Sequence, residues 1–584
     1  MSELIPYPAL ERHGLIGDRR TAALVAADGT IDWLCLPDYD GEAAFGALLD
    51  AGRGGFWRVG PARLWTGEQT YVGDTPVLRT RWSSDEYALE LCDAMASARD
   101  ERASGSEDTR VILRRLHCLR GAVDCVSLFH PFAAALRLWS SRPHLSSAFR
   151  LTSGDVVWLV ASYGETPPWN VERADHAMHD VETFWRETAA QLRRSIDDSE
   201  IVRSAITLRL LEFAPAGSSV AAPTTSLPER IGGDWNADYR LTWVRDASLA
   251  MATLARLGDL ESAARYLEWL ARLEPSDEGA PLQVLYSIRG DRSVEQRDRH
   301  DRTGYRGSKP VRIGNNAFKQ CQLDIFGYLA DCVLVFLEHG GRWRRKFWPM
   351  LRRSADYVSE HWREPDHGIW ELEAKQHYVA SRVMCWTALE RTLRIADRIG
   401  ESPAKAAAWR AAARAIRDEV LRAGWSERRR AFTQALRSDV LDASALLIPL
   451  TGFLPADDDR VRATVDRIAE ELTIDGLTYR FNPGDVPEVQ GSAMGEFESA
   501  FMPCTFWLAS ARALLGRERD AHDVLAAAQR VAGPVGLYAE AIDPRGPAFA
   551  GNTPLLFSHV EHIRARQLLR RMAHRAETSQ RAAG

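Results

Sequence analysis

The stretch Val181–Ile196, VETFWRETAAQLRRSI, marks the place where the character of the sequence changes. Its apolar and aromatic residues recur every three to four positions, which is the spacing of one face of an α-helix. These residues are Val181, Phe184, Trp185, Ala189 and Leu192. The sequence before this stretch has the pattern of short strands, and the sequence after it has the pattern of helices. We therefore predict two structural parts joined by a linker helix over residues 181–200.

Residues 1–180 are predicted to form an all-β domain. In TAALVAADGTIDWLCLP, which begins at Thr21, two short apolar runs flank Asp28-Gly29, a dipeptide typical of hairpin turns. TPVLRTRWSS, VILRRLHCLRGAVDCVSLFHP and DVVWLVASYG continue the pattern, with no long helical period between them. Several short strands separated by turns indicate a β-sandwich.

Residues 201–584 are predicted to be all-α. Helical periodicity is found in Trp243–Leu257, Glu261–Leu273, Lys319–Leu337, Val379–Ile399, Pro403–Ala423, Arg460–Leu472, Phe501–Leu515 and Arg519–Val531. A helical region of this length is too large for a simple bundle and fits a closed toroid of helix pairs. Four long loops interrupt it, over 282–316, 363–378, 482–499 and 534–554. Because long loops in compact domains usually serve function, we expect the site there.

The composition excludes several classes of protein. The 584 residues carry a formal net charge of −6 and 45% hydrophobic residues, so we expect neither nucleic acid nor a membrane as partner. The eight cysteines are scattered, which argues against a zinc cluster or a disulfide scaffold. The N-terminus has no signal-peptide pattern, and no apolar run is long enough to span a membrane. These features predict a cytoplasmic protein.

The loop stretch Gly368–Tyr378, GIWELEAKQHY, contains the first candidate for acid–base chemistry. A carboxyl at Glu371, packed against Ile369 and Trp370, would lose solvation, and this loss disfavours its ionised form. A carboxyl that holds its proton can act as a general acid. The alternative is an ordinary exposed glutamate on a loop.

Two further stretches supply possible partners. In GLYAEAIDP, Glu540 lies between two alanines after an apolar run, and the alternative role is a charge at the edge of an element. In LTWVRDAS, Arg245 and Asp246 offer a donor fork beside a two-oxygen acceptor, which suits the vicinal hydroxyls of a sugar. The alternative there is an aspartate that stabilises a helix start. Cleavage of a glycosidic bond needs two carboxyl groups, and Glu371 with Glu540 would supply them.

At this point the sequence resembles glycoside hydrolase family 15, the family of glucoamylases, glucodextranases and one lineage of α,α-trehalases. The resemblance rests on motifs that follow in the family's order along almost the whole chain. They include IGDRRTAALVAADGTIDWLCLP, APTTSLPERIGG, DYRLTWVRDAS, GYRGSKPVRIGNNA, QCQLDIFGY, GIWE, DASALLIPLTGFLP, GLYAEAIDP and GNTPLLFSH. The resemblance implies an N-terminal all-β super-sandwich followed by an all-α (α/α)6 barrel.

The resemblance also implies roles for individual residues. Glu371 matches the general acid and Glu540 the general base of an inverting hydrolase, with their carboxyl groups roughly 6.5–9.5 Å apart. The family pattern further implies a set of substrate-binding residues. These are Trp243, Arg245, Asp246, Gln322, Asp324, Trp370, His377, Glu498 and His559. No metal or organic cofactor is implied, and no metal-ligand spacing is present.

Three departures from the family pattern lie near the predicted pocket. Ala237 stands where many bacterial members have tryptophan, Leu372–Lys375 replaces a basic Arg-Gly element, and Ala541 replaces Glu or Gln. These differences concern the identity of the substrate more than the type of reaction.

The sequence therefore predicts an exo-acting, inverting α-glucoside hydrolase of the glucoamylase type. It would release β-D-glucose from the non-reducing ends of short α-glucans or other small α-glucosides. An α,α-trehalase of the same family and a sugar-binding homologue with weak catalysis are the alternatives. The oligomeric state is left open, with a homo-oligomer among the options.

Overall fold

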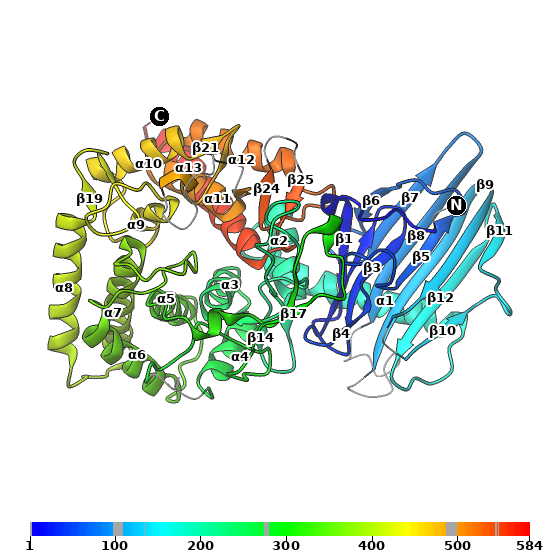
Figure 1. The fold of residues 1–584 in the computed structure, drawn as a ribbon, viewed down its shortest axis with the longest axis horizontal. Coiled ribbons are helices and arrows are strands. Elements are labelled where there is room, and N and C mark those ends of the chain that lie inside the picture. The colour runs from blue at the N-terminus through cyan, green and yellow to red at the C-terminus, as the bar shows by residue number, and fades with distance from the viewer. Residues whose placement is uncertain are drawn as a thin grey trace.

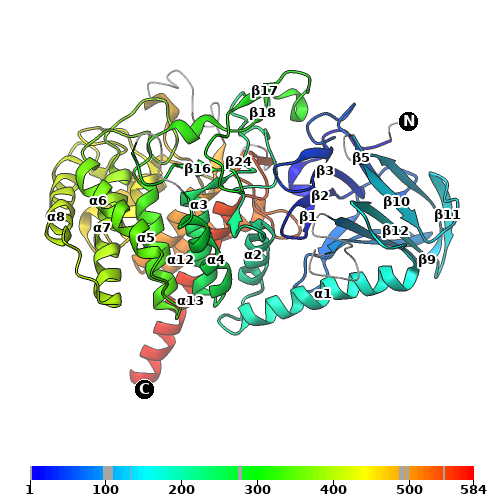
Figure 2. The same cartoon turned by 90° about the horizontal axis from the view of Figure 1, so that it is seen from below.

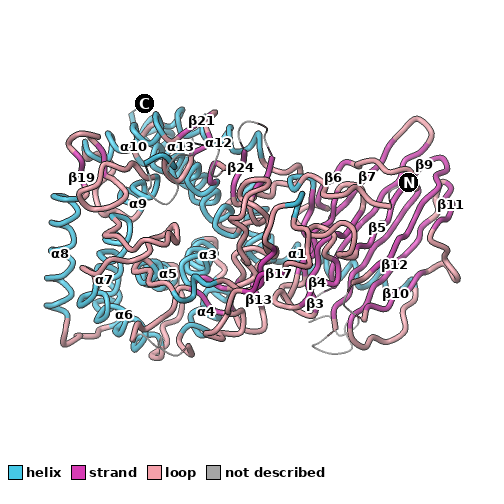
Figure 3. The backbone as a smooth tube through the Cα atoms, viewed as in Figure 1, coloured by secondary structure: helices cyan, strands magenta, loops and turns pink. Residues whose placement is uncertain are grey.

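The computed structural model describes residues 3–96, 109–132, 135–273, 279–485, 494, 499–543, 546 and 548–583. Strands gather in one half of the molecule and helices in the other, so that the two halves lie side by side (Figures 1 and 3). The predicted order, an all-β part followed by an all-α part, is confirmed.

The described residues of the N-terminal half form twelve antiparallel strands. They are β1 (His13–Gly17), β2 (Ala22–Ala26), β3 (Thr30–Leu36), β4 (Glu42–Phe45), β5 (Phe56–Pro61), β6 (Glu68–Tyr71), β7 (Leu78–Ser83), β8 (Tyr87–Ala96), β9 (Arg110–His130), β10 (Leu136–Ser140), β11 (Ala148–Thr152) and β12 (Val156–Tyr163). Strand β9 is 21 residues long and pairs with β8 and β12 through its first half. Its second half pairs with β5 and β11, so one strand belongs to both layers of the sandwich.

The interior of the sandwich is aromatic and contains a buried ion pair between Arg114 and Asp93. Trp33, Trp57 and Trp82 are each at most 2% exposed. The guanidinium of Arg114 lies over the ring of Trp57, and it donates to Asp93 at 2.8 Å and to the carbonyl of Trp57 at 2.7 Å. A buried charge is tolerated when its hydrogen bonds are satisfied in this way.

Helix α1 (Val171–Arg193) connects the two halves and packs against β8 and β12. Figure 2 shows it lying along the sandwich. The helix begins before Val181, the predicted start of the linker. Asn170 caps it by accepting a hydrogen bond from the amide of Arg173, and its first turns bury the small face of Ala174 and Ala177. Alanines give a weak periodic signal, which explains the later predicted start.

The C-terminal half is a closed ring of helices. Its members are α2 (Ser199–Leu210), α3 (Val244–Arg256), α4 (Leu260–Leu270), α5 (Ile325–Glu338), α6 (Phe347–His361), α7 (Val379–Ile399), α8 (Ala406–Ala423), α9 (Leu447–Leu450), α10 (Asp459–Glu471), α11 (Met502–Leu514), α12 (Glu518–Val531) and α13 (Leu556–Ala583). Helices α3, α5, α7, α9, α11 and α13 each contact the next, and α13 returns to α3. The other six pack around them, which gives the predicted (α/α)6 barrel.

One predicted helix is interrupted. The periodic stretch Lys319–Leu337 divides into a short 3-10 turn, η3 (Asn316–Lys319), and helix α5. The residues between them belong to neither helix because their backbone bonds to a neighbouring loop. The amide of Leu323 donates to Asp366 at 2.9 Å, and the amide of His367 donates to the carbonyl of Cys321 at 2.9 Å.

Short strands were also not expected in the helical half. The described residues contain two- and three-residue ladders at the loop end of the barrel, among them β15 (Thr242–Trp243) with β16 (Leu285–Tyr286). A second ladder joins β23 (Ala500–Phe501), β24 (Ala541–Asp543) and β25 (Ala548–Ala550). Pairs this short leave no alternation in the sequence, but they fix the loops that carry the candidate site.

Two other predictions concern composition. All eight cysteines are free thiols, as their spacing indicated. Within the described part of the chain, no helix combines the length and the apolar character needed to cross a membrane.

Candidate active site

A cavity of about 470 Å³ lies at the loop end of the helical ring. Glu371 and Glu540, which are far apart in the sequence, both line it. Trp243, Arg245, Asp246 and Trp370 line the same cavity, so the structure brings together most of the residues predicted for the site. Its other walls come from the loops around Glu229, Gln320 and Arg480.

Glu371 is held by three donors that converge on one carboxylate oxygen. Its Oε1 accepts hydrogen bonds from Trp243 Nε1 at 2.7 Å and from Gln322 Nε2 at 3.2 Å. Arg245 Nη2 is the third donor, at 3.4 Å. The side chain is 25% exposed, toward the cavity. Glu371 therefore lies in a polar setting and is accessible to a substrate.

The apolar wall predicted for Glu371 is not where the sequence suggested. Ile369 and Trp370 are 5% and 6% exposed and both line the cavity. However, the indole N–H of Trp370 points to the carboxylate of Asp442, at 3.0 and 2.9 Å from its two oxygens. Sequence adjacency was misleading because the backbone turns at Glu371, whose φ of +59° is left-handed.

Arg245 and Asp246 lie in the first turn of α3, directly after the short strand β15. Arg245 Nη1 donates to Gln322 Oε1 at 2.8 Å and to Asp324 Oδ2 at 3.4 Å. Burial raises the pKa of Asp246 to about 6, with Arg245 acting in the opposite direction. Asp246 is thus both the helix-start aspartate of the alternative interpretation and a polar group in the cavity.

Glu540 is almost fully buried, at 2% exposure, and both of its oxygens accept hydrogen bonds. Tyr239 donates its hydroxyl to Oε1 at 2.5 Å, and the amide of Asn552 donates to Oε2 at 2.9 Å. Burial is the main cause that raises the pKa of Glu540 above the ordinary glutamate range, and the negative charge of Glu229 nearby adds to this shift. Gly551 is packed against this carboxyl, where any side chain would collide with it.

Glu229 is a further carboxyl in the cavity and was not predicted as a site residue. Arg480 Nη2 donates to its Oε2 at 2.6 Å. Burial raises the pKa of Glu229, Arg480 opposes this shift, and the negative charge of Glu371 adds to it. Glu229 lies in the motif APTTSLPERIGG, and Tyr239 lies in DYRLTWVRDAS. Their position in family motifs could have marked both as site residues, whereas their residue types alone did not.

Four predicted residues lie elsewhere or outside the described part of the chain. Asp324 is 1% exposed beneath Arg245 rather than in the cavity wall. His377 is exposed outside the cavity, and its Nδ1 accepts from Arg382 at 2.7 Å. His559 is fully buried and accepts from the amide of Tyr538 at 3.2 Å, as a structural histidine does. Glu498 lies outside the described residues.

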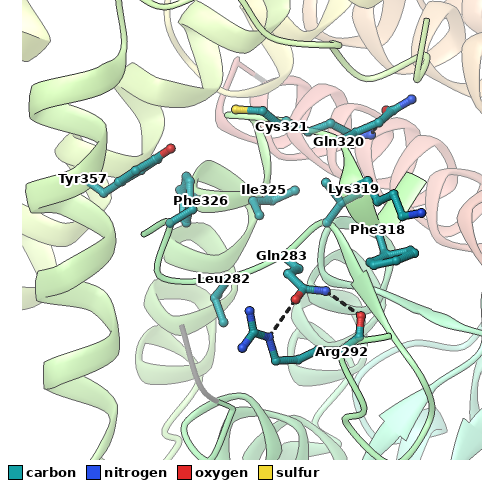
Figure 4. A pocket seen from close by; sticks show the side chains of 13 residues that line it. Leu282, Gln283, Arg292, Phe318, Lys319, Gln320, Cys321, Ile325, Phe326 and Tyr357 are labelled. Atoms are coloured by element: carbon teal, nitrogen blue, oxygen red, sulfur yellow. Dashed lines mark hydrogen bonds between the residues drawn. The ribbon is translucent and has the colours of Figure 1, made fainter. Parts of the chain in front are cut away.

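Gln322 lines a second, smaller cavity of about 170 Å³. Figure 4 shows this cavity from close by. Gln320 lines both cavities, and its Nε2 donates to the backbone carbonyl of Glu371 at 3.0 Å. Across the smaller cavity, Gln283 and Arg292 are hydrogen-bonded to each other. Gln322 therefore acts on the main cavity through its contacts with Arg245 and Glu371.

The three sequence departures also have a place in the structure. Ala237 lines the cavity, and its carbonyl accepts from Asn552 Nδ2 at 3.0 Å. Leu372 and Ala541 are buried, at 2% and 1% exposure, whereas Glu373 is exposed at the cavity. The residues that replace the Arg-Gly element thus contribute an acidic group, Glu373, to the cavity.

Comparisons with known proteins identify relatives over almost the whole chain. The family model for glycosyl hydrolases family 15 matches residues 196–533, and the model for the trehalase-like N-terminal domain matches residues 6–114. A trehalase of Mycolicibacterium smegmatis is 35% identical, covering 96% of this chain and 91% of that protein. A trehalase of Thermoplasma volcanium is 31% identical, covering 96% and 93%.

A solved structure shares the arrangement of both halves. It is a bacterial glucoamylase complexed with acarbose, with a TM-score of 0.67 and 12% identity, covering 98% of this chain and 95% of that one. At this identity the likeness concerns the fold alone, a β-sandwich followed by a helical barrel. The family model and the trehalase relatives show that the chain is a glycoside hydrolase and belongs to glycosyl hydrolases family 15.

Proposed function

We propose that this enzyme is an α,α-trehalase, which hydrolyses trehalose to two molecules of glucose. The near end-to-end match to proteins named trehalase, at up to 35% identity, carries this proposal. It favours the alternative predicted from the sequence over the glucoamylase-type activity. The cavity of about 470 Å³ is within the range of small-ligand sites and can accommodate a disaccharide. A cytoplasmic location stays a prediction from the sequence.

The residues in the cavity support an inverting mechanism. Arg245 and Asp246 bind the hydroxyls of the terminal glucose, and Glu371 protonates the glycosidic oxygen as it leaves. Glu540 takes a proton from the water that attacks the anomeric carbon from the opposite face. Tyr239 and the amide of Asn552 hold Glu540 in place for this step. Because the pKa of Glu540 is raised, its ionised, active form increases as the pH rises through its pKa.

A substrate panel tests the proposal. We expect kcat/KM on trehalose to exceed that on maltose, isomaltose and maltotriose at least about tenfold, a difference of about 1.4 kcal/mol in transition-state binding. Glucose release should fall by at least about 1000-fold in Glu371→Gln and Glu540→Gln, because each variant lacks one member of the pair. A preference for maltotriose would instead support the glucoamylase-type activity.

The anomers of the first products test the mechanism separately. Inversion at one anomeric carbon of trehalose gives β-glucose, while the leaving glucose keeps its α configuration. Proton NMR before mutarotation should therefore show the two anomers in equal amounts. Only α-glucose at early times would exclude inversion. Trehalose binding by the wild type without glucose release would support the sugar-binding alternative.

A further inference from the structure

Trp370, the residue before the proposed acid, is anchored by the buried carboxylate of Asp442, which has no part in the mechanism proposed above. Its side chain is 6% exposed and lines the cavity. Its indole N–H lies 3.0 and 2.9 Å from the two oxygens of Asp442, which is fully buried. An N–H placed between both oxygens of a carboxylate makes a charge-assisted hydrogen bond of roughly twice the ordinary strength.

Asp442 is itself held firmly. The amide of Ser444 donates to Oδ1 at 2.7 Å, so Asp442 caps the 3-10 turn η4 (Ala443–Leu446). Gln434 Nε2 donates to Oδ2 at 2.9 Å. A buried carboxylate with donors on both oxygens has one orientation, and the indole of Trp370 must adapt to it.

Glu371 needs such an anchor because its backbone is strained. Its φ of +59° is left-handed, a conformation that costs a non-glycine residue on the order of 1 kcal/mol and persists only where the surroundings enforce it. Gln320 holds the residue from one side, through the carbonyl of Glu371. Trp370 holds it from the other side, between Asp442 and the rings of Phe501 and Trp507, whose centroids lie 5.7 and 5.9 Å away.

Asp442 also connects the acid to another wall of the cavity. The amide of Ala443 donates to the carbonyl of Arg480 at 2.8 Å, and Asp442 forms an isolated bridge with Phe481. Arg480 lines the cavity and binds Glu229. The loop that carries the acid and the segment that carries Arg480 therefore share one anchor.

We propose that Asp442 is a positioning residue, which holds Trp370 and through it keeps Glu371 in the geometry needed to protonate the leaving group. The inference rests on the proposed role of Glu371 as the acid. The side chain of Asp442 lies outside the cavity and binds Trp370, whereas its links to Arg480 and Phe481 run through the backbone, which a change of side chain leaves in place. The effect of removing this side chain should therefore be confined to substrates whose leaving group needs a proton.

Two substrates separate this role from a general structural one. Trehalose has a sugar leaving group that must be protonated, whereas the fluoride of α-D-glucosyl fluoride departs with little help from an acid. In Asp442→Ala we expect kcat on trehalose to fall about 100-fold, as for a misplacement of about 1 Å. On the fluoride we expect a change within about threefold, and Asp442→Asn, which keeps one acceptor, should restore part of the trehalose activity.

Asp356→Ala is a matched control. Asp356 accepts a hydrogen bond from the indole of Trp409 at 3.0 Å, between α6 and α8 and away from the cavity. Loss of this bond should leave kcat on both substrates unchanged. Equal losses on both substrates in Asp442→Ala, or unchanged trehalose activity, would overturn the proposal. If Asp442→Ala does not fold, Asp442→Asn, whose side chain lies outside the cavity and keeps one acceptor, is judged by the same comparison.

A crystal structure of Asp442→Ala gives a test that does not depend on the substrate. We expect the carboxyl of Glu371 to move by about 1 Å or more, or its φ to leave the left-handed region. An unmoved Glu371 would refute the positioning role even if trehalose proves not to be the substrate. Failure of wild type on trehalose with a displaced Glu371 in the variant would refute only the proposed function.

Discussion

At the scale of single residues, the proposed base depends on a glycine that leaves room for it. Gly551 has a φ of +73°, and a Cβ there would stand 2.2 Å from Oε2 of Glu540 and 2.7 Å from its Cβ. We predict that Gly551→Ala lowers kcat about 100-fold, because the carboxyl must move away from its partners Tyr239 and Asn552. Steady-state hydrolysis of the preferred substrate measures this effect.

Gly452→Ala separates the collision from the backbone cost. Gly452 has the same φ of +73°, but a Cβ there would meet no atom within 4 Å. Both variants should lose about 1 kcal/mol of stability from placing alanine in the left-handed region, while only Gly551→Ala loses activity. Equal kcat values in the two variants would contradict this account of Gly551.

At the scale of elements, the periodicity of the sequence predicted where helices form. It did not predict interruptions and side-chain partners that depend on contacts between residues far apart in the chain. Helix α7 begins and ends where its periodic pattern does, at Val379 and Ile399. The pattern of Lys319–Leu337 was equally helical, yet residues 320–324 lie outside any helix because Asp366 and His367 bind their backbone. Likewise, Tyr239 and Glu229 entered no prediction because their partners, Glu540 and Arg480, are hundreds of residues away.

The hydrogen bond between the amide of Leu323 and the carboxyl of Asp366 makes the stability of the protein depend on pH. Asp366 is fully buried, and its Oδ2 accepts from the amide of Leu323 and from Ser381. Burial raises its pKa to about 7, with the amide of Leu323 and Ser381 opposing the shift. A raised carboxyl pKa means that folding favours the protonated form, so this contribution to stability is complete at low pH and is lost as the pH rises through 7.

We therefore predict that Asp366→Asn, which mimics the protonated form, flattens this dependence. Between pH 5 and pH 8, the melting temperature of wild type should decline relative to that of Asp366→Asn, as measured by calorimetry at each pH. A constant difference between the two proteins across this range would show that Asp366 does not titrate there.

At the scale of the whole molecule, the β-sandwich supports a loop of the active site. The indole of Trp33, in β3, donates to the carbonyl of Pro223 at 2.8 Å, and Arg240 Nη1 donates to the carbonyl of Gly41 at 3.1 Å. Pro223 and Arg240 flank the segment that carries Glu229 and Tyr239. The two halves are therefore expected to act as one catalytic unit, whereas the sequence alone placed the site only in the loops of the helical half.

This dependence predicts an effect of a sandwich residue on catalysis. Trp33→Phe leaves the carbonyl of Pro223 without its partner, at a cost of about 1–3 kcal/mol, and the loop should relax. We expect kcat to fall about three- to tenfold as Tyr239 shifts against Glu540. The control is Trp82→Phe, which removes the indole bond to the carbonyl of Trp65, at 3.2 Å, within the sandwich itself. Trp82→Phe should lower the melting temperature by a similar amount and leave kcat unchanged, because this bond does not hold a loop of the active site. Equal kcat values in the two variants would mean that the sandwich stabilises the barrel without positioning its site.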